Sequence, residues 1–282
     1  MAHLIPLEGL ADLLAGSPSH RPLLLDVRYG GPGSAPGRDA YRAAHLPGAR
    51  FVDLEEVLSD PAVGDTRGRH PLPSPERFEA GMRQAGVSAH RAVVVYDDWS
   101  SIAAARAWWL LRHWGHDRVR VLDGGLGAWR AAGRPTEAGD VIGPPGDFSA
   151  RGPRLTVLDA DEAAALPHAG VLLDARPAGR FRGEGETIDP VAGHIPGARS
   201  LPAVDLVSGD GRLLPPADLA TRFAGVGLDD QTPAAAYCGS GVQACHVALA
   251  AAVAGVTDDL GLYAASWSGW SAEPGRPVAT GG

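Results

Sequence analysis

The interpretation of this chain begins at Ala235-Ala236-Tyr237-Cys238-Gly239-Ser240-Gly241-Val242-Gln243-Ala244-Cys245. The short apolar run 234–237 predicts a buried strand, and the Ala-rich stretch after Gly241, through Ala254, predicts a helix. Cys238 therefore stands where a strand ends and a helix begins, among small residues that let backbone N–H groups turn inward. Such N–H groups, together with a helix N-terminus, stabilise an anion and so favour the nucleophilic thiolate.

The two cysteines of the chain receive different interpretations. Most cysteines are buried packing residues, but a packing cysteine does not need flanking glycines such as Gly239 and Gly241. We therefore interpret Cys238 as a nucleophile. Cys245 falls inside the helical run, and we expect it to pack in the core. The hydroxyl of Ser240 has two open roles, since it can donate to the sulfur or relay a proton, or it can cap the turn.

The sequence repeats itself in order and in spacing. Residues 23–28 (LLLDVR) return as 171–176 (VLLDAR), a His-x-Pro-Gly-Ala element follows at 45–49 and at 194–198, and 93–97 (VVVYD) matches 234–238 (AAAYC). Trp129 follows Asp97 by 32 residues, and Trp270 follows Cys238 by the same interval. Landmarks that keep order, spacing and residue type together indicate a duplicated domain.

Each half predicts an α/β fold. Apolar strand-like runs at 23–27, 93–96, 119–122, 171–174, 234–237 and 260–263 alternate with helical stretches such as 75–86 and 100–114. This alternation predicts a parallel sheet with helices on both faces, and ligands of such sheets bind beyond the C-terminal strand ends. Cys238 stands at such an end, and Asp97 takes its place in the first half. Because Asp97 cannot perform thiol chemistry, we expect a catalytically silent first domain that helps to complete a site between the domains.

The length of 282 residues also favours two domains. We place the N-terminal domain at 1–140, a linker at 141–153 and the C-terminal domain at 154–282. The linker falls in a Gly/Pro-rich segment, where proline opposes helix and favours an extended chain. A second Gly/Pro-rich stretch, residues 30–37, lacks the frame of a phosphate-binding loop, and we expect a surface loop there.

Composition excludes several classes of function. The net charge of -8 opposes a nucleic-acid surface, and no apolar run reaches the length that spans a membrane. The first residues lack the blocks of a signal peptide, and two cysteines cannot build a disulfide framework, so we expect a cytoplasmic protein. No Cys/His spacing resembles a zinc site. We expect a monomer with no metal and no cofactor.

These landmarks resemble the tandem-domain rhodanese-type sulfurtransferases, and the resemblance covers essentially the whole chain. It rests on the repeat, the paired Asp-x-Arg and His-x-Pro-Gly-Ala elements, the loop Cys238-Gly239-Ser240-Gly241-Val242 and the ending at 262–270. It implies two tandem rhodanese-like domains. It also implies that Cys238 takes a sulfane sulfur from a donor, carries it as a persulfide and passes it to a nucleophilic acceptor. The loop resembles that of the 3-mercaptopyruvate branch, whereas the thiosulfate branch often places cations there.

The loop also separates sulfur chemistry from phosphate chemistry. The backbone N–H groups of Gly239, Gly241 and Val242 are expected to surround a persulfide anion and to complete the substrate site. A cysteine-dependent phosphatase needs an arginine six positions after its cysteine, and that position is Ala244. The sequence therefore disfavours a phosphate-handling enzyme.

The anionic end of the donor needs a cation that faces the sulfur. Arg180 matches the family's Gly-Arg-Phe/Tyr element and is expected to hold that end through two parallel hydrogen bonds. Arg182 is the alternative, and Arg176 is expected to be an ion-pair residue. Members of the mercaptopyruvate branch usually carry a second arginine several residues later, but residues 184–190 contain no cation.

The N-terminal half contributes the expected proton-transfer group. The stretch 66–73 resembles the family loop that brings a histidine, here His70, toward the cysteine. The family couples that histidine to a carboxylate, which we place at Glu55, with Asp53 as the alternative. A histidine oriented by a carboxylate can move the proton that C–S cleavage requires.

Two classes of function follow. The first is a sulfurtransferase that uses 3-mercaptopyruvate or thiosulfate as donor, with cyanide or a thiol as acceptor, for example thioredoxin or another dithiol. The second is a sulfur-carrier or regulatory module that uses Cys238 without efficient turnover. Cys238, Arg180 and His70 together favour the enzyme.

Overall fold

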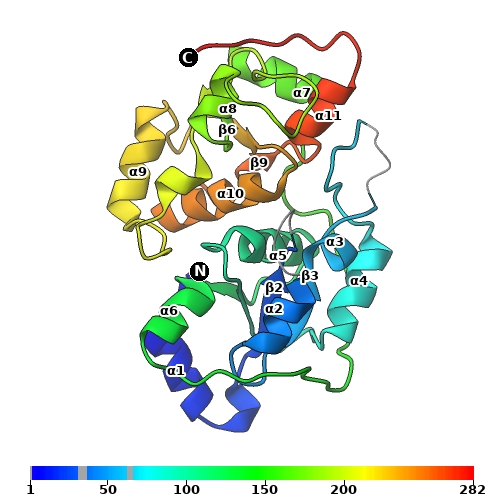
Figure 1. Cartoon of the computed structure of the whole chain (residues 1–282), viewed down its shortest axis with the longest axis vertical. Coiled ribbons are helices and arrows are strands. Elements are labelled where there is room, and N and C mark those ends of the chain that lie inside the picture. Colours follow the sequence, from blue (N-terminus) through cyan, green and yellow to red (C-terminus); the bar gives the residue numbers. More distant parts are fainter. Residues whose placement is uncertain (1, 31–36, 62–65) are drawn as a thin grey trace. The chain divides into compact units, whose positions relative to one another are not determined.

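The computed structural model describes residues 2–30, 37–61 and 66–282 (Figure 1). The chain divides into two compact units, which differ from the expected halves in two short segments. Unit 1 comprises 1–60, 73–154 and 208–213, and unit 2 comprises 61–72, 155–207 and 214–282. Most of the surface loop expected at 30–37 lies outside the described residues. Among the described residues, no helix combines the length and apolar character needed to cross a membrane.

Unit 1 is built on a parallel five-stranded sheet in the order β1-β5-β4-β2-β3. Its strands are β1 (Leu4–Ile5), β2 (Leu23–Arg28), β3 (Arg50–Asp53), β4 (Val93–Tyr96) and β5 (Val119–Leu122). Its helices are α1 (Leu7–Ala15), α2 (Gly37–Ala43), α3 (Leu54–Val57), α4 (Pro75–Gln84), α5 (Ile102–His113) and α6 (Gly125–Ala131), with the 3-10 turn η1 (Pro18–His20). The predicted strands at 93–96 and 119–122 are confirmed.

The central strands of unit 1 bury both of their faces, because successive side chains point to opposite sides of a sheet. On one face, Leu24 and Val94 pack in a cluster with Leu10 of α1 and Trp129 of α6. The long helix α5 contacts β2, β4 and β5 and covers the other face. The expected sheet with helices on both faces is therefore present.

Unit 2 carries a parallel four-stranded sheet in the order β7-β6-β8-β9. Its strands are β6 (Val171–Asp174), β7 (Arg199–Ser200), β8 (Ala234–Tyr237) and β9 (Gly261–Leu262). Its helices are α7 (Ala160–Ala165), α8 (Ala178–Arg182), α9 (Pro216–Gly225), α10 (Val242–Ala254) and α11 (Ser266–Ala272), with 3-10 turns η2 (Leu166–His168) and η3 (Ala203–Leu206). In Figure 1, α9 and α10 lie on one side of this sheet, and α7, α8 and α11 lie on the other.

The two sheets have the same strand order over four strands and the same pairing register between their central strands. Asp26 of β2 lies opposite Tyr96 of β4, and Asp174 of β6 lies opposite Tyr237 of β8. The order β3-β2-β4-β5 of unit 1 corresponds to β7-β6-β8-β9 of unit 2. Each of the two tyrosine hydroxyls accepts a hydrogen bond from the residue after the histidine of a His-x-Pro-Gly-Ala element, at 2.9 Å and 3.1 Å. The landmarks of the sequence repeat therefore occupy equivalent places.

The segment expected to be a linker, 141–153, is extended and belongs to unit 1. Backbone hydrogen bonds attach it to the region around α4 and α5: Gly146 N donates to Arg83 O at 2.8 Å, and Arg151 N donates to Trp114 O at 2.9 Å. The prolines do prevent regular structure here, but the segment lies against the unit that precedes it rather than forming a detached tether.

Asp97 occupies in unit 1 the position that Cys238 occupies in unit 2. Each residue directly follows a central strand, and its carbonyl accepts a hydrogen bond of 2.9 Å from a residue 29 positions later, Leu126 in unit 1 and Trp267 in unit 2. After Asp97, Ser100 and Ser101 adopt positive φ angles of 52° and 66°. Helix α5 consequently begins at Ile102, two residues later than the predicted stretch 100–114.

The carboxylate of Asp97 fills the ring of N–H groups around it. Its Oδ1 accepts hydrogen bonds from the N–H groups of Trp99 and Ser101, and its Oδ2 accepts one from Ala104, each at 2.9 Å. Complete burial raises the pKa of Asp97 to about 6, although these three N–H groups oppose the shift. The loop of unit 1 thus supplies its own anion.

This burial predicts a pH dependence of stability. Because the folded pKa of about 6 exceeds the unfolded value of 3.8, the folded state binds the Asp97 proton more tightly, and stability falls as pH rises from about 4 to 6. Two pKa units correspond to about 3 kcal/mol. Relative to wild type, Asp97→Asn should therefore gain up to about 3 kcal/mol in unfolding free energy between pH 4 and pH 7. Urea unfolding of both proteins at the two pH values measures this.

Asp39→Asn changes an exposed carboxylate of the same unit and serves as the control. Its unfolding free energy relative to wild type should vary little over the same pH range. If the difference in unfolding free energy between Asp97→Asn and wild type stays constant from pH 4 to pH 7, the prediction is wrong.

Candidate active site

The loop from Cys238 to Gly241 joins β8 to α10, as predicted. Cys238 is buried, and Gly241 N donates to its Sγ at 3.0 Å. Gly241 has a φ of +80°, and a Cβ at this position would lie 2.5 Å from Ala264 O. Two independent reasons therefore require glycine at position 241: the positive φ and the lack of space for a Cβ. The resulting turn directs an N–H group at the sulfur next to the start of a 13-residue helix.

Hydrogen bonds attach this loop to the start of α11. Cys238 N donates to Ser266 Oγ at 3.0 Å, and the same hydroxyl donates to Tyr263 O at 3.0 Å. Trp267 N donates to Cys238 O at 2.9 Å, and Ser268 N donates to Gly239 O at 3.0 Å. The backbone of Cys238 and of Gly239 is thus fixed by hydrogen bonds to the residues around the start of α11.

His70 and Ser240 meet inside unit 2. The segment 61–72 packs with unit 2, although it precedes most of unit 1 in the sequence. His70 is nearly buried, and its Nδ1 lies 2.8 Å from Ser240 Oγ. Of the two roles left open for Ser240, a hydroxyl that can pass a proton to or from histidine agrees with this contact.

Arg180 lies on α8 and is held by two carboxylates. Its Nε and Nη2 donate to the two oxygens of Glu186, each at 2.9 Å, and Nη2 also donates to Asp189 Oδ2 at 2.8 Å. Burial alone would raise the pKa of Glu186, yet the N–H groups of Ile188 and Asp189 and the Arg180 guanidinium hold that pKa below its ordinary value. The guanidinium of Arg180 is therefore fixed in orientation by ionised partners.

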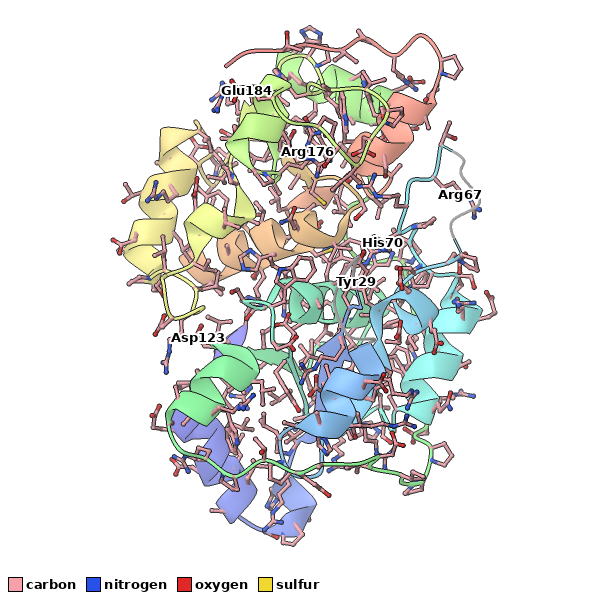
Figure 2. The ribbon with its side chains drawn as sticks, viewed as in Figure 1. Tyr29, Arg67, His70, Asp123, Arg176 and Glu184 are labelled. Atoms are coloured by element: carbon pink, nitrogen blue, oxygen red, sulfur yellow. The ribbon has the colours of Figure 1, made fainter. Side chains whose placement is uncertain are left out.

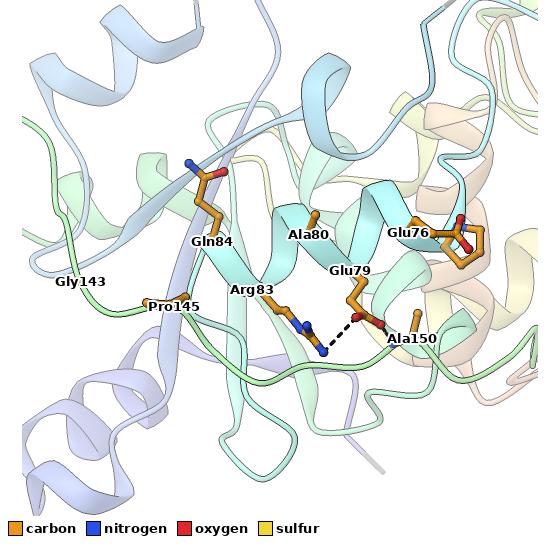
Figure 3. Close-up of a pocket in the computed structure, with 9 residues that line it drawn as sticks. Glu76, Glu79, Ala80, Arg83, Gln84, Gly143, Pro145 and Ala150 are labelled. Atoms are coloured by element: carbon orange, nitrogen blue, oxygen red, sulfur yellow. Dashed lines mark hydrogen bonds and ion pairs between the residues drawn. The ribbon is translucent and has the colours of Figure 1, made fainter.

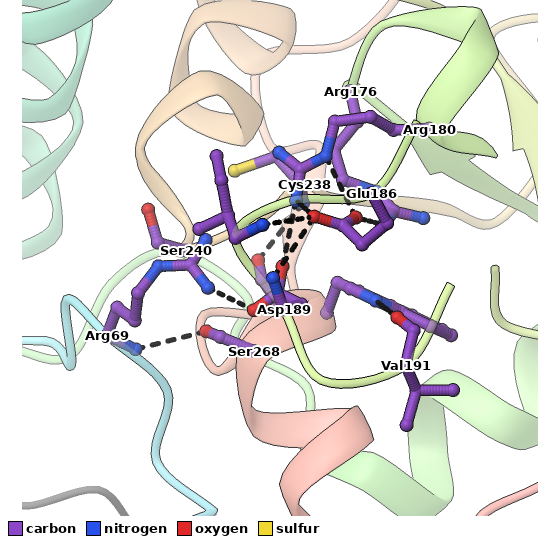
Figure 4. A network of polar contacts seen from close by, with 12 residues as sticks. Arg69, Arg176, Arg180, Glu186, Asp189, Val191, Cys238, Ser240 and Ser268 are labelled. Atoms are coloured by element: carbon purple, nitrogen blue, oxygen red, sulfur yellow. Dashed lines mark hydrogen bonds and ion pairs between the residues drawn. The ribbon is translucent and has the colours of Figure 1, made fainter. Parts of the chain in front are cut away.

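Arg69 is a second guanidinium at the same place (Figure 4). Its Nη1 donates to Asp189 Oδ1, and its backbone N donates to Ser268 Oγ at 3.0 Å. A Cβ built on Gly239 would lie 2.9 Å from Arg69 Nη2 and 3.5 Å from Arg180 Nη1. Both cations therefore approach Gly239, the residue that follows Cys238.

The geometry agrees with a known domain family. The model of the rhodanese-like domain matches residues 8–132 and 159–273, which is most of the chain. The chain belongs to the rhodanese-like family. The expectation of two rhodanese-like domains is therefore confirmed.

Similar proteins refine this family assignment. This rhodanese-like chain is 46% identical over 267 residues to a probable 3-mercaptopyruvate sulfurtransferase of Pseudomonas aeruginosa, with 92% of each chain covered. It is 44% identical over 286 residues to the putative thiosulfate sulfurtransferase SseB of Mycobacterium tuberculosis, covering 99% of this chain and 97% of SseB. The crystal structure of SseA from Escherichia coli superposes with a TM-score of 0.82 at 33% identity, covering 95% of this chain and 99% of SseA. The chain is therefore a sulfurtransferase enzyme.

Of the three arginines weighed in the sequence of this sulfurtransferase, Arg180 is the one whose guanidinium lies beside Gly239. Arg176 is fully buried and pairs with Asp174 at 2.6 Å, in agreement with an ion-pair role. Arg182 pairs with exposed Glu184 at 2.8 Å. Figure 2 shows Arg176 inside unit 2 and Glu184 at its surface.

The carboxylate partner expected for His70 remains a prediction. Glu55 lies on α3 in unit 1. Asp53, the alternative, accepts hydrogen bonds from the backbone N–H groups of Glu55 and Glu56 and so caps α3. This capping role engages the Asp53 carboxylate, which favours Glu55 of the two candidates.

Three residues of this cluster were not predicted from the sequence: Arg69, Glu186 and Asp189. Residues 184–190 were expected to matter only through the absence of a cation, whereas two of their carboxylates fix the orientation of Arg180. Arg69 stands directly before His70, so its place beside an expected proton-transfer group was the available signal. The 120-residue separation between Arg69 and Asp189 explains why no local pattern revealed their pairing.

A separate cavity of about 710 Å³ lies beside α4 in unit 1 (Figure 3). Two of its charged groups engage each other, since Glu79 pairs with Arg83 at 2.9 Å, and Glu79 also accepts a hydrogen bond from Ala150 N at 2.9 Å. It contains none of the groups expected to perform the chemistry.

The geometry of the loop predicts that Gly241→Ala disables the enzyme more than Gly255→Ala does. Both glycines have positive φ, so both variants lose about 1 kcal/mol in backbone conformation. Only at position 241 does the added Cβ collide with a backbone carbonyl, since nothing lies within 4 Å of a Cβ at 255. Sulfur-transfer assays and thermal unfolding of both variants measure this, and equal losses of activity would contradict it.

Proposed function

We propose that this sulfurtransferase takes sulfur from 3-mercaptopyruvate, carries it as a persulfide on Cys238 and passes it to a thiol acceptor. The observation that carries the proposal is the environment of the buried Cys238 Sγ. This sulfur accepts a hydrogen bond from Gly241 N, and the next residue, Gly239, lies beside the guanidinium groups of Arg69 and Arg180. The relative from Pseudomonas aeruginosa, named as a probable enzyme for this donor, adds support.

In the first step the Cys238 thiolate attacks the sulfur of 3-mercaptopyruvate. A new S–S bond forms, and the C–S bond of the donor breaks with its electron pair remaining on carbon. The proton of the donor thiol moves to that carbon, so the products are the Cys238 persulfide anion and pyruvate. N–H groups directed at the terminal sulfur stabilise its negative charge.

His70 and Ser240 are suited to move that proton. A histidine exchanges protons near neutral pH, and the 2.8 Å contact between its Nδ1 and Ser240 Oγ gives a relay of one hydroxyl. Glu55 is the proposed carboxylate that orients His70. In the second step a dithiol such as thioredoxin attacks the outer sulfur, becomes a disulfide and releases sulfide, which restores the Cys238 thiolate.

Thiosulfate is the second candidate donor, favoured by the name of the similar SseB. The loop of residues 238–242 carries no charged side chain that could match a dianion. Two carboxylates, of Glu186 and Asp189, also lie among the nearby arginines. We therefore place 3-mercaptopyruvate first.

The two cysteines give the direct test of the persulfide. Cys238→Ser should abolish transfer and leave the fold intact, because oxygen replaces sulfur with little change of volume. Cys245 donates to Gly241 O at 3.3 Å inside α10, so Cys245→Ser should retain most activity. Intact-mass measurement after treatment with 3-mercaptopyruvate should find one added sulfur on wild type and on Cys245→Ser, and none on Cys238→Ser. Equal loss in both variants would refute the assignment.

Donor preference is the second test. We expect a larger kcat/KM for 3-mercaptopyruvate than for thiosulfate, and a fall of about ten- to a hundredfold for 3-mercaptopyruvate in Arg180→Ala, as for the loss of one charge-assisted contact. Arg182→Ala removes a neighbouring exposed arginine and should leave the kinetics unchanged. A better kcat/KM with thiosulfate would reverse the donor assignment, and an unaffected Arg180→Ala would move the anion site elsewhere.

A further inference from the structure

Two arginines from distant parts of the chain converge on one buried carboxylate in unit 2. Arg69, from the segment 61–72, donates to Oδ1 of Asp189, and Arg180, on α8, donates to Oδ2 at 2.8 Å. The Asp189 side chain is only 2% exposed, whereas both arginines are partly exposed. Figure 4 shows the two guanidinium groups on either side of Asp189. A fixed anion therefore holds the two cations close together with part of each facing solvent.

Each guanidinium keeps one nitrogen for a ligand. Within the part of the chain that the structure describes, Arg69 Nη2 and Arg180 Nη1 have no hydrogen-bond acceptor. These are the same two nitrogens that a Cβ on Gly239 would meet at 2.9 Å and 3.5 Å. Because Gly239 has no side chain, the space beside Cys238 remains open to both nitrogens.

We propose that Arg69 is the second cation of the donor site and binds the donor carboxylate together with Arg180, while Asp189 is a positioning residue for both. This inference rests on the proposed function. Residues 184–190 supply no cation, so a two-arginine site needs a guanidinium from another segment. Arg69 supplies it from beside His70, and its backbone N–H donates to Ser268 Oγ on α11, whose own N–H donates to Gly239 O in the loop of Cys238.

The carboxylates of Asp189 and Glu186 determine which donor charge the two arginines accept. Arg69 and Arg180 carry two positive charges, and Asp189 and Glu186 carry two negative ones, so the four groups have no net charge. A monocarboxylate adds one negative charge while it receives one N–H donor from each arginine. A dianion such as thiosulfate adds a second charge near two nearly buried carboxylates, and this repulsion is weakly screened. The site therefore selects a monocarboxylate.

The test pairs each enzyme variant with a donor that lacks the carboxylate. Mercaptoacetone keeps the thiol and the ketone of 3-mercaptopyruvate but has a methyl group in place of the carboxylate. For Arg69→Ala we expect the KM for 3-mercaptopyruvate to rise about ten- to a hundredfold, with kcat changed much less. The kcat/KM for mercaptoacetone should stay within a few fold of wild type. Arg67→Ala, which removes an exposed arginine of the same segment, is the matched control.

Exchanging the charges of residues 69 and 189 gives a second test, in which lost activity should be recovered. Arg69→Asp should weaken 3-mercaptopyruvate binding at least as much as Arg69→Ala, because it places two carboxylates side by side. The double variant Arg69→Asp/Asp189→Arg restores one ion pair with its direction reversed, and it should recover at least tenfold of the lost kcat/KM. No recovery would contradict a shared carboxylate-binding role for the pair.

The outcomes separate this inference from the proposed function. If wild type forms no Cys238 persulfide from 3-mercaptopyruvate, the proposed function is wrong. If wild type forms it and Arg69→Ala has an unchanged KM, the function stands and Arg69 is not a binding residue. Equal losses with both donors in Arg69→Ala would show that Arg69 only maintains the structure, which also overturns the inference.

Discussion

The buried pair of Asp174 and Arg176 is the interaction on which the site depends. Arg176 donates to Asp174 through Nε and Nη2, and to Gly193 O at 2.6 Å, while its guanidinium lies 4.7 Å from the ring centre of Trp267. Asp174 stands opposite Tyr237, the last residue before Cys238. One fully buried cation thus joins β6, β8 and the start of α11. Removing either partner leaves an uncompensated buried charge, which typically costs about 3–5 kcal/mol, so the position of the cysteine depends on both.

The same frame in unit 1 carries a different anion. Arg28 pairs there with Asp26, and Asp97 directly follows β4, the strand that pairs with β2. In unit 2 the Sγ of Cys238 accepts an N–H bond from the loop, and in the proposed mechanism this sulfur carries the transferred sulfur atom. In unit 1 the carboxylate already takes three N–H groups and is fully enclosed. A carboxylate at this strand end therefore engages the backbone N–H groups of its own loop, and the loop of unit 1 reaches its helix one residue later than the loop of unit 2 does.

Local patterns predicted most of the strands and the strand–loop–helix element that carries Cys238. The strands 93–96, 119–122, 171–174 and 234–237 and the helix after Gly241 follow from apolar runs and small residues a few positions apart. The start of α5 could not be predicted, because two consecutive serines adopt positive φ, which serine rarely does. Arg69 was missed for another reason: its pairing with Asp189 spans 120 residues and depends on the segment 61–72 joining unit 2. A contact between residues so far apart in the chain cannot be predicted from local sequence spacing.

The site is electrically balanced, and this changes how it can recognise a donor. From Asp174 through Arg176, Glu186, Arg180 and Asp189 to Arg69, positive and negative groups alternate, with Arg176 and Glu186 3.8 Å apart. Bringing one fully buried and two partly exposed guanidinium groups together without these carboxylates would be costly, so the alternation makes the cluster possible. It also leaves little net field, and the chain as a whole carries a charge of -8, so an anion is not attracted from a distance. In the proposed donor site, recognition comes from short-range hydrogen bonds donated by Arg69 Nη2 and Arg180 Nη1. Such bonds reward the planar geometry of a carboxylate more than they reward total charge.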